Sequence, residues 1–394
     1  MNRCRLENFG PIKNVNIDFG DLTILIGPQA SGKSLFLEMF KFYKDRSQVL
    51  ETLRKYNYII NKVNSRSVIE TYFGEGMGSL ITADTLLSID DGQEHTGDKL
   101  LKVLATPVPR EKGVREKIFY IPAQRIMSID DGRTKNFMEF DISAPYILRN
   151  FSEILRIFVQ GGLGNPDIIF PMNNRLKGHL KKSINESIFH GSRVVLDKSS
   201  GQRKMKLETG GNLIPFMTWS AGQKEFLPLL LSFYCLSGVP NKIVNSGNYE
   251  TIIIEEPEMG LHPKAIISIV LQIIDLMRAG YKVVISTHST TFLEFAWTFY
   301  NLKDLSIADF RKSMCELFEV NEGSTTASLF ESIYGKVIKT YYFKPNKNGT
   351  GVTSIDISSL DAGSADDIIS EWGGLSSFSG KAADIVLEYS NRVY

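Results

Sequence analysis

Apolar and polar positions near the start of the chain follow the pattern of short strands. Three strands separated by two turns are predicted there, at residues 4–9, 15–20 and 22–27 with turns at Gly10-Pro11 and Gly20-Asp21. Residues 35–44 are rich in helix formers and carry apolar side chains on most faces, which predicts a helix buried on several sides. The first 44 residues therefore predict three strands, a loop and a helix.

Further along, helical patterns alternate with continuous apolar runs. Helices are predicted at residues 46–56, 98–104, 144–160, 221–234 and 263–280. Buried strands are predicted at residues 117–123, 250–256 and 282–289. Because these strands are apolar throughout, they predict a mostly parallel α/β sheet that is covered by helices on both faces.

The last part of the chain has a different pattern. Residues 339–357 predict a hairpin around the sequence NKNGTG, and two short helices are expected at 365–372 and 380–391. The aromatic run YYF (341–343) leaves two interpretations open. The tail either docks a partner or closes the sheet of the main domain.

Composition narrows the protein class without naming a function. The chain has 394 residues, 43% hydrophobic and 23% charged, and this length suggests roughly two or three structural units. A net charge of +1 provides no global field for nucleic acid or an anionic membrane. Residues 192–208 are a candidate basic patch, with a solvated hairpin or loop as the alternative.

Cysteine spacing and hydropathy favour a soluble protein of a reducing compartment. Cys4, Cys235 and Cys315 are too widely spaced for a metal site or a disulfide framework. The N-terminus has no apolar segment of the signal-peptide type, and no run of 18 or more apolar residues occurs. We therefore expect a cytoplasmic protein with no membrane association.

The clearest chemical motif is GPQASGKS at residues 27–34, which fits the phosphate-loop pattern G-x-x-x-x-G-K-[ST]. Glycines let the backbone N–H groups turn toward phosphate oxygens, the lysine reaches the β- and γ-phosphates, and the serine hydroxyl can bind Mg²⁺. The alternative is a plain glycine-rich turn. The predicted nucleotide-binding residues are Gly27, Pro28, Gln29, Ala30, Ser31, Gly32, Lys33 and Ser34.

A second motif is a pair of acids at the end of the apolar run TIIIEE. A phosphate loop needs a carboxylate on the metal side from a neighbouring strand, and Glu255 is in the expected position. Glu256 would then face the γ-phosphate and act as general base toward a water. Alternation along a strand would point the two side chains in different directions. The alternative is two exposed acids at a strand end.

Two further motifs precede and follow the acids. The sequence WSAGQKE (219–225) is a second candidate anion site at a helix start, and its alternative is a capping box between Ser220 and Gln223. His288 falls at the end of an apolar strand, where ligands bind in α/β sheets. A structural histidine is the alternative there.

Taken in order, these motifs resemble the ABC-class ATPases, and within them the RecF, SMC and OLD-like group. The resemblance is carried by the opening strands with the phosphate loop, by EEPEMGLHP and by STHSTTFLE. It covers residues 1–44 and 212–300, with FYIPAQR (119–125) as a weaker match. Two positions depart from the pattern: Glu255 stands where aspartate is commoner, and Ala221 replaces the second glycine of the signature.

The resemblance implies a P-loop NTPase fold with an ABC-type head and ATP and Mg²⁺ as cofactors. ATP would lie between two heads, with the loop of one facing Ser220, Gly222 and Gln223 of the other. The implied metal ligands are Ser34, Glu255 and Gln124, and the implied catalytic pair is Glu256 and His288. We expect the head at residues 1–44, 115–125 and 212–320, an inserted helical or lid region at 45–114 and 126–211, and a C-terminal extension at 321–394.

Four functions are compatible with such a head. The favoured one is an ATPase switch that forms a homodimer or higher homo-oligomer and controls a separate effector, a nuclease or toxin, in anti-phage defence. The alternative is a RecF-like repair ATPase that binds DNA. A nuclease is disfavoured because no Asp-x-Asp follows His288. A transporter motor is disfavoured by EEPEMGLHP and by the long middle insertion.

Overall fold

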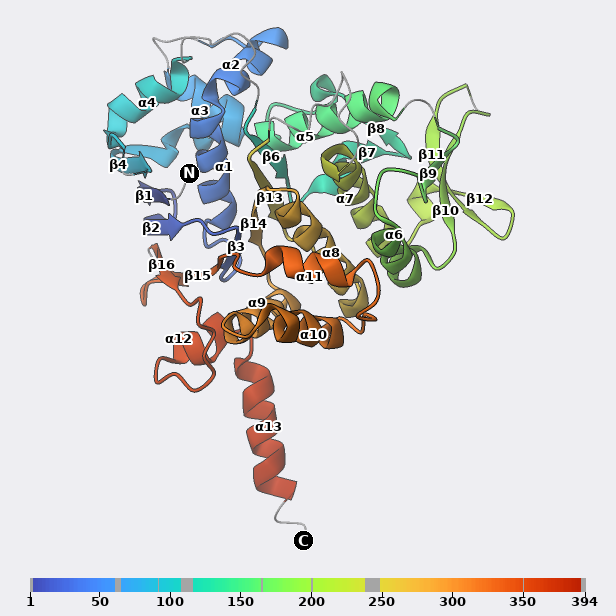
Figure 1. Cartoon of the computed structure of the whole chain (residues 1–394). Coiled ribbons are helices and arrows are strands. Elements are labelled where there is room, and N and C mark those ends of the chain that lie inside the picture. Colours follow the sequence, from blue (N-terminus) through green and yellow to red (C-terminus); the bar gives the residue numbers. More distant parts are fainter. Residues whose placement is uncertain are drawn as a thin grey trace.

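The computed structural model describes residues 3–60, 65–90, 92–107, 116–163, 166–199, 201–237, 249–349 and 351–390. Its centre is a ten-stranded sheet in the order β5-β4-β1-β2-β16-β15-β3-β14-β13-β6 (Figure 1). In that order the strands are His95–Thr96, Ile81–Ile89, Arg3–Phe9, Ile12–Asp18, Val352–Asp356, Ile338–Pro345, Leu22–Ile26, Lys282–Ser286, Thr251–Glu255 and Ile118–Ile121.

The sheet combines a parallel block with an antiparallel edge. Within the block β15-β3-β14-β13-β6, each strand runs parallel to the next one. β5, β4, β1 and β2 pair antiparallel, as do β15 and β16, while β16 and β2 are parallel. The predicted α/β class, with a mostly parallel centre and antiparallel N-terminal strands, is confirmed.

Two hydrophobic cores cover the two faces of this sheet. Ile24 and Ile254 point into one core, and Leu25 and Ile253 point into the other, as strand alternation requires. The second core is formed with α1 (Lys33–Lys44), α2 (Arg46–Lys55), α3 (Ser65–Phe73) and α4 (Gly97–Ala105). The first is formed with α5 (Tyr146–Ile157), α7 (Ala221–Ser237), α8 (Pro263–Arg278), α9 (Thr290–Leu302), α10 (Ile307–Leu317) and α11 (Ala327–Ile333).

The inserted regions contain strands in addition to the helices that the sequence predicted. Within residues 126–211 and just beyond them, a separate antiparallel sheet has the order β12-β11-β10-β9, and α6 (Gly178–Ile184) precedes β10. Its strands are Asn212–Pro215, Lys204–Thr209, Arg193–Asp197 and Ile168–Phe170. Residues 45–114 likewise contribute β4 and β5 to the main sheet. Both insertions therefore combine helices, α2 to α4 in the first and α5 and α6 in the second, with strands that the expected helical or lid region did not include.

The candidate basic patch at residues 192–208 is a hairpin. β10 and β11 pair antiparallel, with Arg193 opposite Glu208. Arg193 contacts Glu208 at 2.6 Å, and Lys206 contacts Asp197 at the same distance. Because these basic side chains have acidic partners on the hairpin, the interpretation as a solvated hairpin is confirmed.

The C-terminal hairpin lies inside the main sheet. β15 and β16 sit between β2 and β3, so these two strands of the expected C-terminal extension belong to the main sheet. The predicted hairpin is confirmed, and of the two interpretations of the tail, sheet closure is the one observed. Beyond it, α12 (Asp367–Ser370) is followed by α13 (Ser377–Ser390), which projects from the body (Figure 1).

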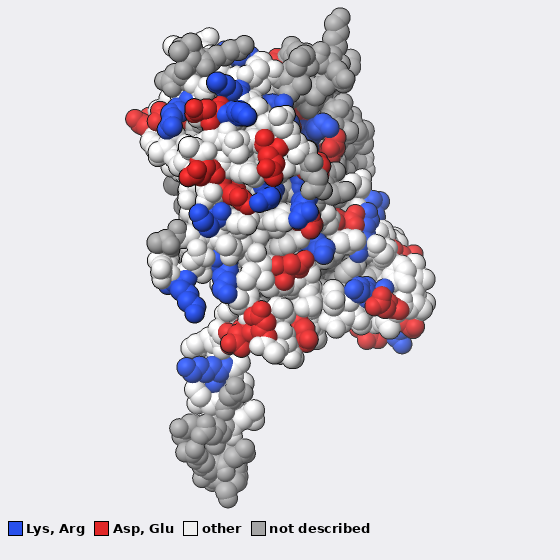
Figure 2. Space-filling view, turned by 90° about the vertical axis from the view of Figure 1, so that its left-hand side faces the viewer, with Lys and Arg blue, Asp and Glu red and all other residues white. Residues whose placement is uncertain are grey.

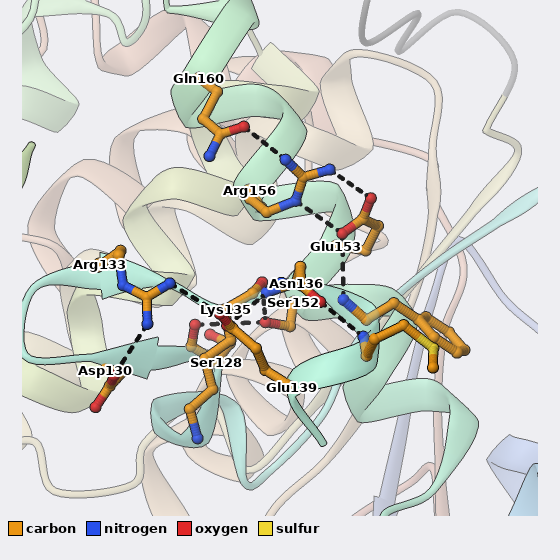
Figure 3. A network of polar contacts seen from close by, with 12 residues as sticks. Ser128, Asp130, Arg133, Lys135, Asn136, Glu139, Ser152, Glu153, Arg156 and Gln160 are labelled. Atoms are coloured by element: carbon orange, nitrogen blue, oxygen red, sulfur yellow. Dashed lines mark hydrogen bonds and ion pairs between the residues drawn. The ribbon is translucent and has the colours of Figure 1, made fainter. Parts of the chain in front are cut away.

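A polar network fixes the segment that follows β6 against α5 (Figure 3). Glu153 accepts hydrogen bonds from Arg156 and from the backbone N–H of Phe137, at 2.7–3.3 Å. Ser152 donates to the carbonyl of Lys135 at 2.8 Å, and Ser128 donates to the carbonyl of Arg125 at 2.6 Å. The turns after β6 are therefore tied to a buried helix, which matters for the residues that they carry toward the site.

Two simpler expectations can also be compared with the structure. The three cysteines are buried and unpaired. Among the described residues, no helix is both long enough and apolar enough to cross a membrane.

Candidate nucleotide-binding site

The predicted phosphate loop connects β3 to α1, as a strand–loop–helix unit requires. Its glycines have positive φ angles, 150° at Gly27 and 84° at Gly32, which L-residues rarely adopt. A Cβ on Gly27 would lie 2.9 Å from the carbonyl oxygen of Phe343 on β15. The backbone path therefore requires both glycines. The loop places the N-terminus of α1 at the carboxyl end of β3.

Lys33 is the first residue of α1 and is only 7% exposed. Its ammonium donates to the carbonyls of Gly27 at 2.8 Å and Pro28 at 3.0 Å. Burial lowers the pKa of Lys33 from about 10.5 to about 8, and the carboxylates of Glu256, Glu255 and Glu258 oppose that shift. A buried cation held against the loop is well placed to meet phosphate oxygens.

The three residues implied as metal ligands meet in one cavity. Ser34, Gln124 and Glu255 line a cavity of about 160 Å³, together with Glu38 and several apolar residues. The described residues hold no cluster of three or more His, Cys, Asp or Glu side chains that could bind a metal alone. A hydroxyl, an amide and a carboxylate suit Mg²⁺, which is usually held by one or two carboxylates plus substrate phosphates.

Glu255 provides the specific test of that fit. It ends β13 and is 4% exposed, and Oε2 accepts from the Ala123 N–H at 3.2 Å. Among the described residues, Oε1 is buried without a hydrogen-bond partner. Burial raises the pKa of Glu255, while the nearby hydroxyl of Ser34 and the Ala123 N–H lower it. An unpartnered carboxylate oxygen beside a small cavity that Ser34 and Gln124 also line fits a bound cation.

Glu256 and His288 approach each other beside Glu255, just beyond the carboxyl ends of β13 and β14. His288 Nε2 lies 4.0 Å from Glu256 Oε1, and each side chain is about one-third exposed. Glu256 lies beyond β13 and has a φ of 43°, so the left-handed backbone sets its direction instead of strand alternation. Strained backbone of this kind gathers at functional sites. The two predicted catalytic groups are therefore adjacent and accessible.

Sequence reasoning missed Arg125, which holds the backbone at Glu255 and Glu256. It is fully buried and donates to the carbonyls of Glu255 at 3.0 Å, Glu256 at 3.1 Å and Glu225 at 3.1 Å. Burial lowers the pKa of Arg125, and the carboxylates of Glu225 and Glu258 oppose the shift. Its signals in the sequence were its place after the strand 117–123 and at the end of FYIPAQR, the weaker part of the resemblance. Glu38 could have been found from its spacing, because it lies four residues after Ser34 on one helix face.

We expect Arg125→Ala to destabilise the protein strongly. Loss of a buried guanidinium that binds three carbonyls leaves those acceptors unpaired, at a cost of about 3–5 kcal/mol in the free energy of unfolding. Urea denaturation measures this cost, and Arg203→Ala, at an exposed position, is the matched control. Equal midpoints for the two variants would contradict the role given to Arg125.

The helix start at Ser220 is a capping box within the chain. The Ser220 hydroxyl accepts from the Gln223 N–H, and Gln223 Oε1 accepts from the Ser220 N–H, both at 3.3 Å. The Gln223 side chain also donates to the carbonyl of Ile188 at 3.3 Å. A Cβ on Gly222 would lie 2.7 Å from the carbonyl of Gly260. The capping interpretation is confirmed, and Ser220 remains exposed at the start of α7.

The strand order and the loop geometry together define an α/β fold of the P-loop NTPase class. Residues 143–294, less than half of the chain, match a family model described as "AAA domain, putative AbiEii toxin, Type IV TA system". The matched segment includes Ser220, Glu255, Glu256 and His288 but not the phosphate loop. No curated protein matches the chain at a significant level.

Solved structures with a similar arrangement include two SMC heads. One is titled "SMC head domain from Thermotoga maritima", with 12% identity, a TM-score of 0.38, and coverage of 90% of this chain and 98% of that chain. The other is titled "Crystal structure of the SmcHead bound to the C-winged helix domain of ScpA", with 12% identity, a TM-score of 0.39, and coverage of 91% and 99%. At this identity and TM-score, neither match adds an argument about function.

Proposed function

We propose that the chain binds ATP with Mg²⁺ and hydrolyses it to ADP and phosphate. This proposal rests on one observation. Lys33, the cavity at Glu255 and the Glu256–His288 pair all lie at the carboxyl ends of the adjacent strands β3, β14 and β13. The segment match to an AAA domain supports the same class. Phosphate release by the purified chain with ATP and Mg²⁺ tests it, and no release above that of Glu256→Gln would overturn it.

Each residue has a distinct part in the proposed reaction. The loop N–H groups and Lys33 bind the β- and γ-phosphates, and Ser34, Gln124 and Glu255 would hold the metal. A bound Mg²⁺ would neutralise charge on the phosphate oxygens. Glu256 accepts a proton from the attacking water, and His288 hydrogen-bonds the γ-phosphate. Arg125 holds the backbone of both acids in place.

We further propose that the active unit is a dimer with ATP between two heads. Ser220 and Gln223 are bonded to each other at the exposed start of α7, a helix of 17 residues whose N-terminus can face an anion. In the dimer this helix start, with Gly222, would face the γ-phosphate bound by the other copy. Ala221 stands in place of the second glycine of the signature, and Gly222 is still in contact with Gly260.

We expect Ser220→Arg to block hydrolysis without blocking ATP binding to the isolated head. A guanidinium at the exposed helix start opposes close approach of a second head, and it does not touch the phosphate loop. Turnover should fall at least about tenfold while the ATP dissociation constant stays within about twofold. Ser328→Arg, at an exposed serine near the start of α11, is the control. Normal hydrolysis in Ser220→Arg would refute the two-head site.

The finer proposal is that this ATPase controls a separate effector in anti-phage defence. It is supported by the family description, which names a toxin of a toxin–antitoxin system. On the face shown in Figure 2, Lys and Arg side chains are interspersed with Asp and Glu, so this face does not favour a DNA-binding role. A pull-down of Glu256→Gln with ATP from the native cell distinguishes the effector switch from the DNA-binding repair role. A nuclease or toxin supports the switch, and DNA alone overturns it.

A further inference from the structure

The third glutamate of the EEPE sequence makes contacts that the proposed reaction does not yet use. Oε1 of Glu258 accepts from the Thr287 hydroxyl at 2.7 Å and from the backbone N–H of His288 at 2.6 Å. One carboxylate oxygen thus holds two of the three residues of the loop that leads from β14 to α9. Hydrogen bonds to a charged acceptor are stronger than neutral ones.

These contacts fix where the histidine backbone lies. Thr287 is fully buried, and its N–H donates to the carbonyl of Leu25 on β3 at 3.0 Å. Its hydroxyl accepts from the N–H of Ser289, which caps α9. The backbone at His288 is therefore held by hydrogen bonds that reach β3, the N-cap of α9 and Glu258.

The turn that carries Glu258 is itself well anchored. The N–H of Met259 donates to the carbonyl of Glu256 at 3.0 Å, and the N–H of Leu261 donates to the carbonyl of Glu258 at 2.9 Å. Gly260 adopts a φ of 71° and packs against Gly222 at the start of α7. Glu258 therefore has little freedom to leave Thr287 and His288.

We propose that Glu258 is a positioning residue that sets His288 beside Glu256. It acts through Thr287 Oγ1 and the His288 backbone, not through contact with the nucleotide. Without this carboxylate the loop after β14 loses two hydrogen bonds, and the 4.0 Å approach between His288 Nε2 and Glu256 Oε1 is no longer fixed. The inference rests on the proposed function, since positioning has a catalytic effect only if His288 serves ATP hydrolysis.

The kinetic test is a double-mutant cycle. Glu258→Ala lowers kcat by about ten- to a hundredfold, each factor of ten being about 1.36 kcal/mol in the barrier, with the ATP dissociation constant within about twofold. In a His288→Ala background the same change has no further effect, because both act through one group. Glu258→Gln, which keeps an acceptor oxygen, recovers most of the rate. Wild-type turnover in Glu258→Ala, or equal losses in both backgrounds, would overturn the proposal.

A second readout is independent of turnover. The chain has five histidines, so the imidazole NMR signal of His288 is assigned by its loss in His288→Ala and compared with the other four. Glu258→Ala shifts the His288 signal and leaves the others in place. An unchanged signal overturns the inference. A wild-type chain that does not hydrolyse ATP overturns the proposed function. In that case the NMR shift of His288 in Glu258→Ala still decides whether Glu258 positions His288.

Thr287→Val covers the case in which Glu258→Ala does not fold. Valine keeps the shape of the buried threonine and removes one of the two donors to Glu258. The expected loss in kcat is smaller, about three- to tenfold, and it again disappears in the His288→Ala background. A Thr287→Val chain that folds and turns over ATP at the wild-type rate would count against the positioning role.

Discussion

Lys33→Ala should lose ATP binding by at least about a hundredfold, because under the proposed function its buried ammonium binds the β- and γ-phosphates. Two charge-assisted hydrogen bonds worth about 1.5–3 kcal/mol each account for a loss of this size. Fluorescent-nucleotide titration or calorimetry measures it. Lys99→Ala, at an exposed position of α4, should bind as the wild type does. Retained ATP affinity in Lys33→Ala would sink the assignment of the phosphate loop.

The pH dependence of binding gives the same prediction an internal check. The pKa of Lys33 is lowered to about 8, so the free protein carries a protonated ammonium at pH 7 and loses it as the pH rises above 8. Only the protonated form attracts phosphate, so the ATP dissociation constant should rise toward tenfold per pH unit between about pH 8 and 9.5. The residual binding of Lys33→Ala should lack this dependence.

Glu256→Gln should bind ATP normally and turn it over about 10²–10⁴-fold more slowly. The amide cannot accept a proton from the attacking water, and general-base catalysis contributes a factor of this order. Glutamine meets the same backbone strain at a φ of 43°, so stability should change little. With ATP still bound between the heads, the dimer should persist, and size-exclusion chromatography with light scattering measures this.

The matched control is Glu294→Gln, which alters an exposed acid on α9. It should hydrolyse ATP at the wild-type rate and should not accumulate as a dimer. Turnover by Glu256→Gln at the control rate would refute its role as general base. Loss of ATP binding in the same variant would instead place Glu256 among the binding groups.

Local features of the fold could be predicted from the sequence because they depend on neighbouring residues. The phosphate loop, the helix after it and the apolar strand before Glu255 follow from spacing and periodicity alone. The motifs already placed Ser34 and Glu255 on the metal side, and only Gln124 was added by the resemblance. The geometry now supports this metal site with an unpartnered carboxylate oxygen.

What could not be predicted depends on contacts between distant segments. Arg125 lies 130 residues from Glu255 in the chain, and no local pattern marks the carbonyls that it binds. The direction of Glu256 was expected from strand alternation, but a left-handed residue sets it. The position of β15 and β16 inside the sheet was one of two open interpretations, because periodicity identifies strands without giving their order.

That strand order has a consequence for how the chain is made. β3 pairs with β14 and β15, which are synthesised more than 250 residues after it. A nascent chain that has not yet reached residue 338 exposes an edge of β3 that could pair with other chains. Gly27 also packs on Phe343, so the phosphate loop lacks one neighbouring strand until residue 343 has been synthesised. Long-range pairing of this kind folds slowly, so a product terminated before residue 338 should lack a complete phosphate-loop region.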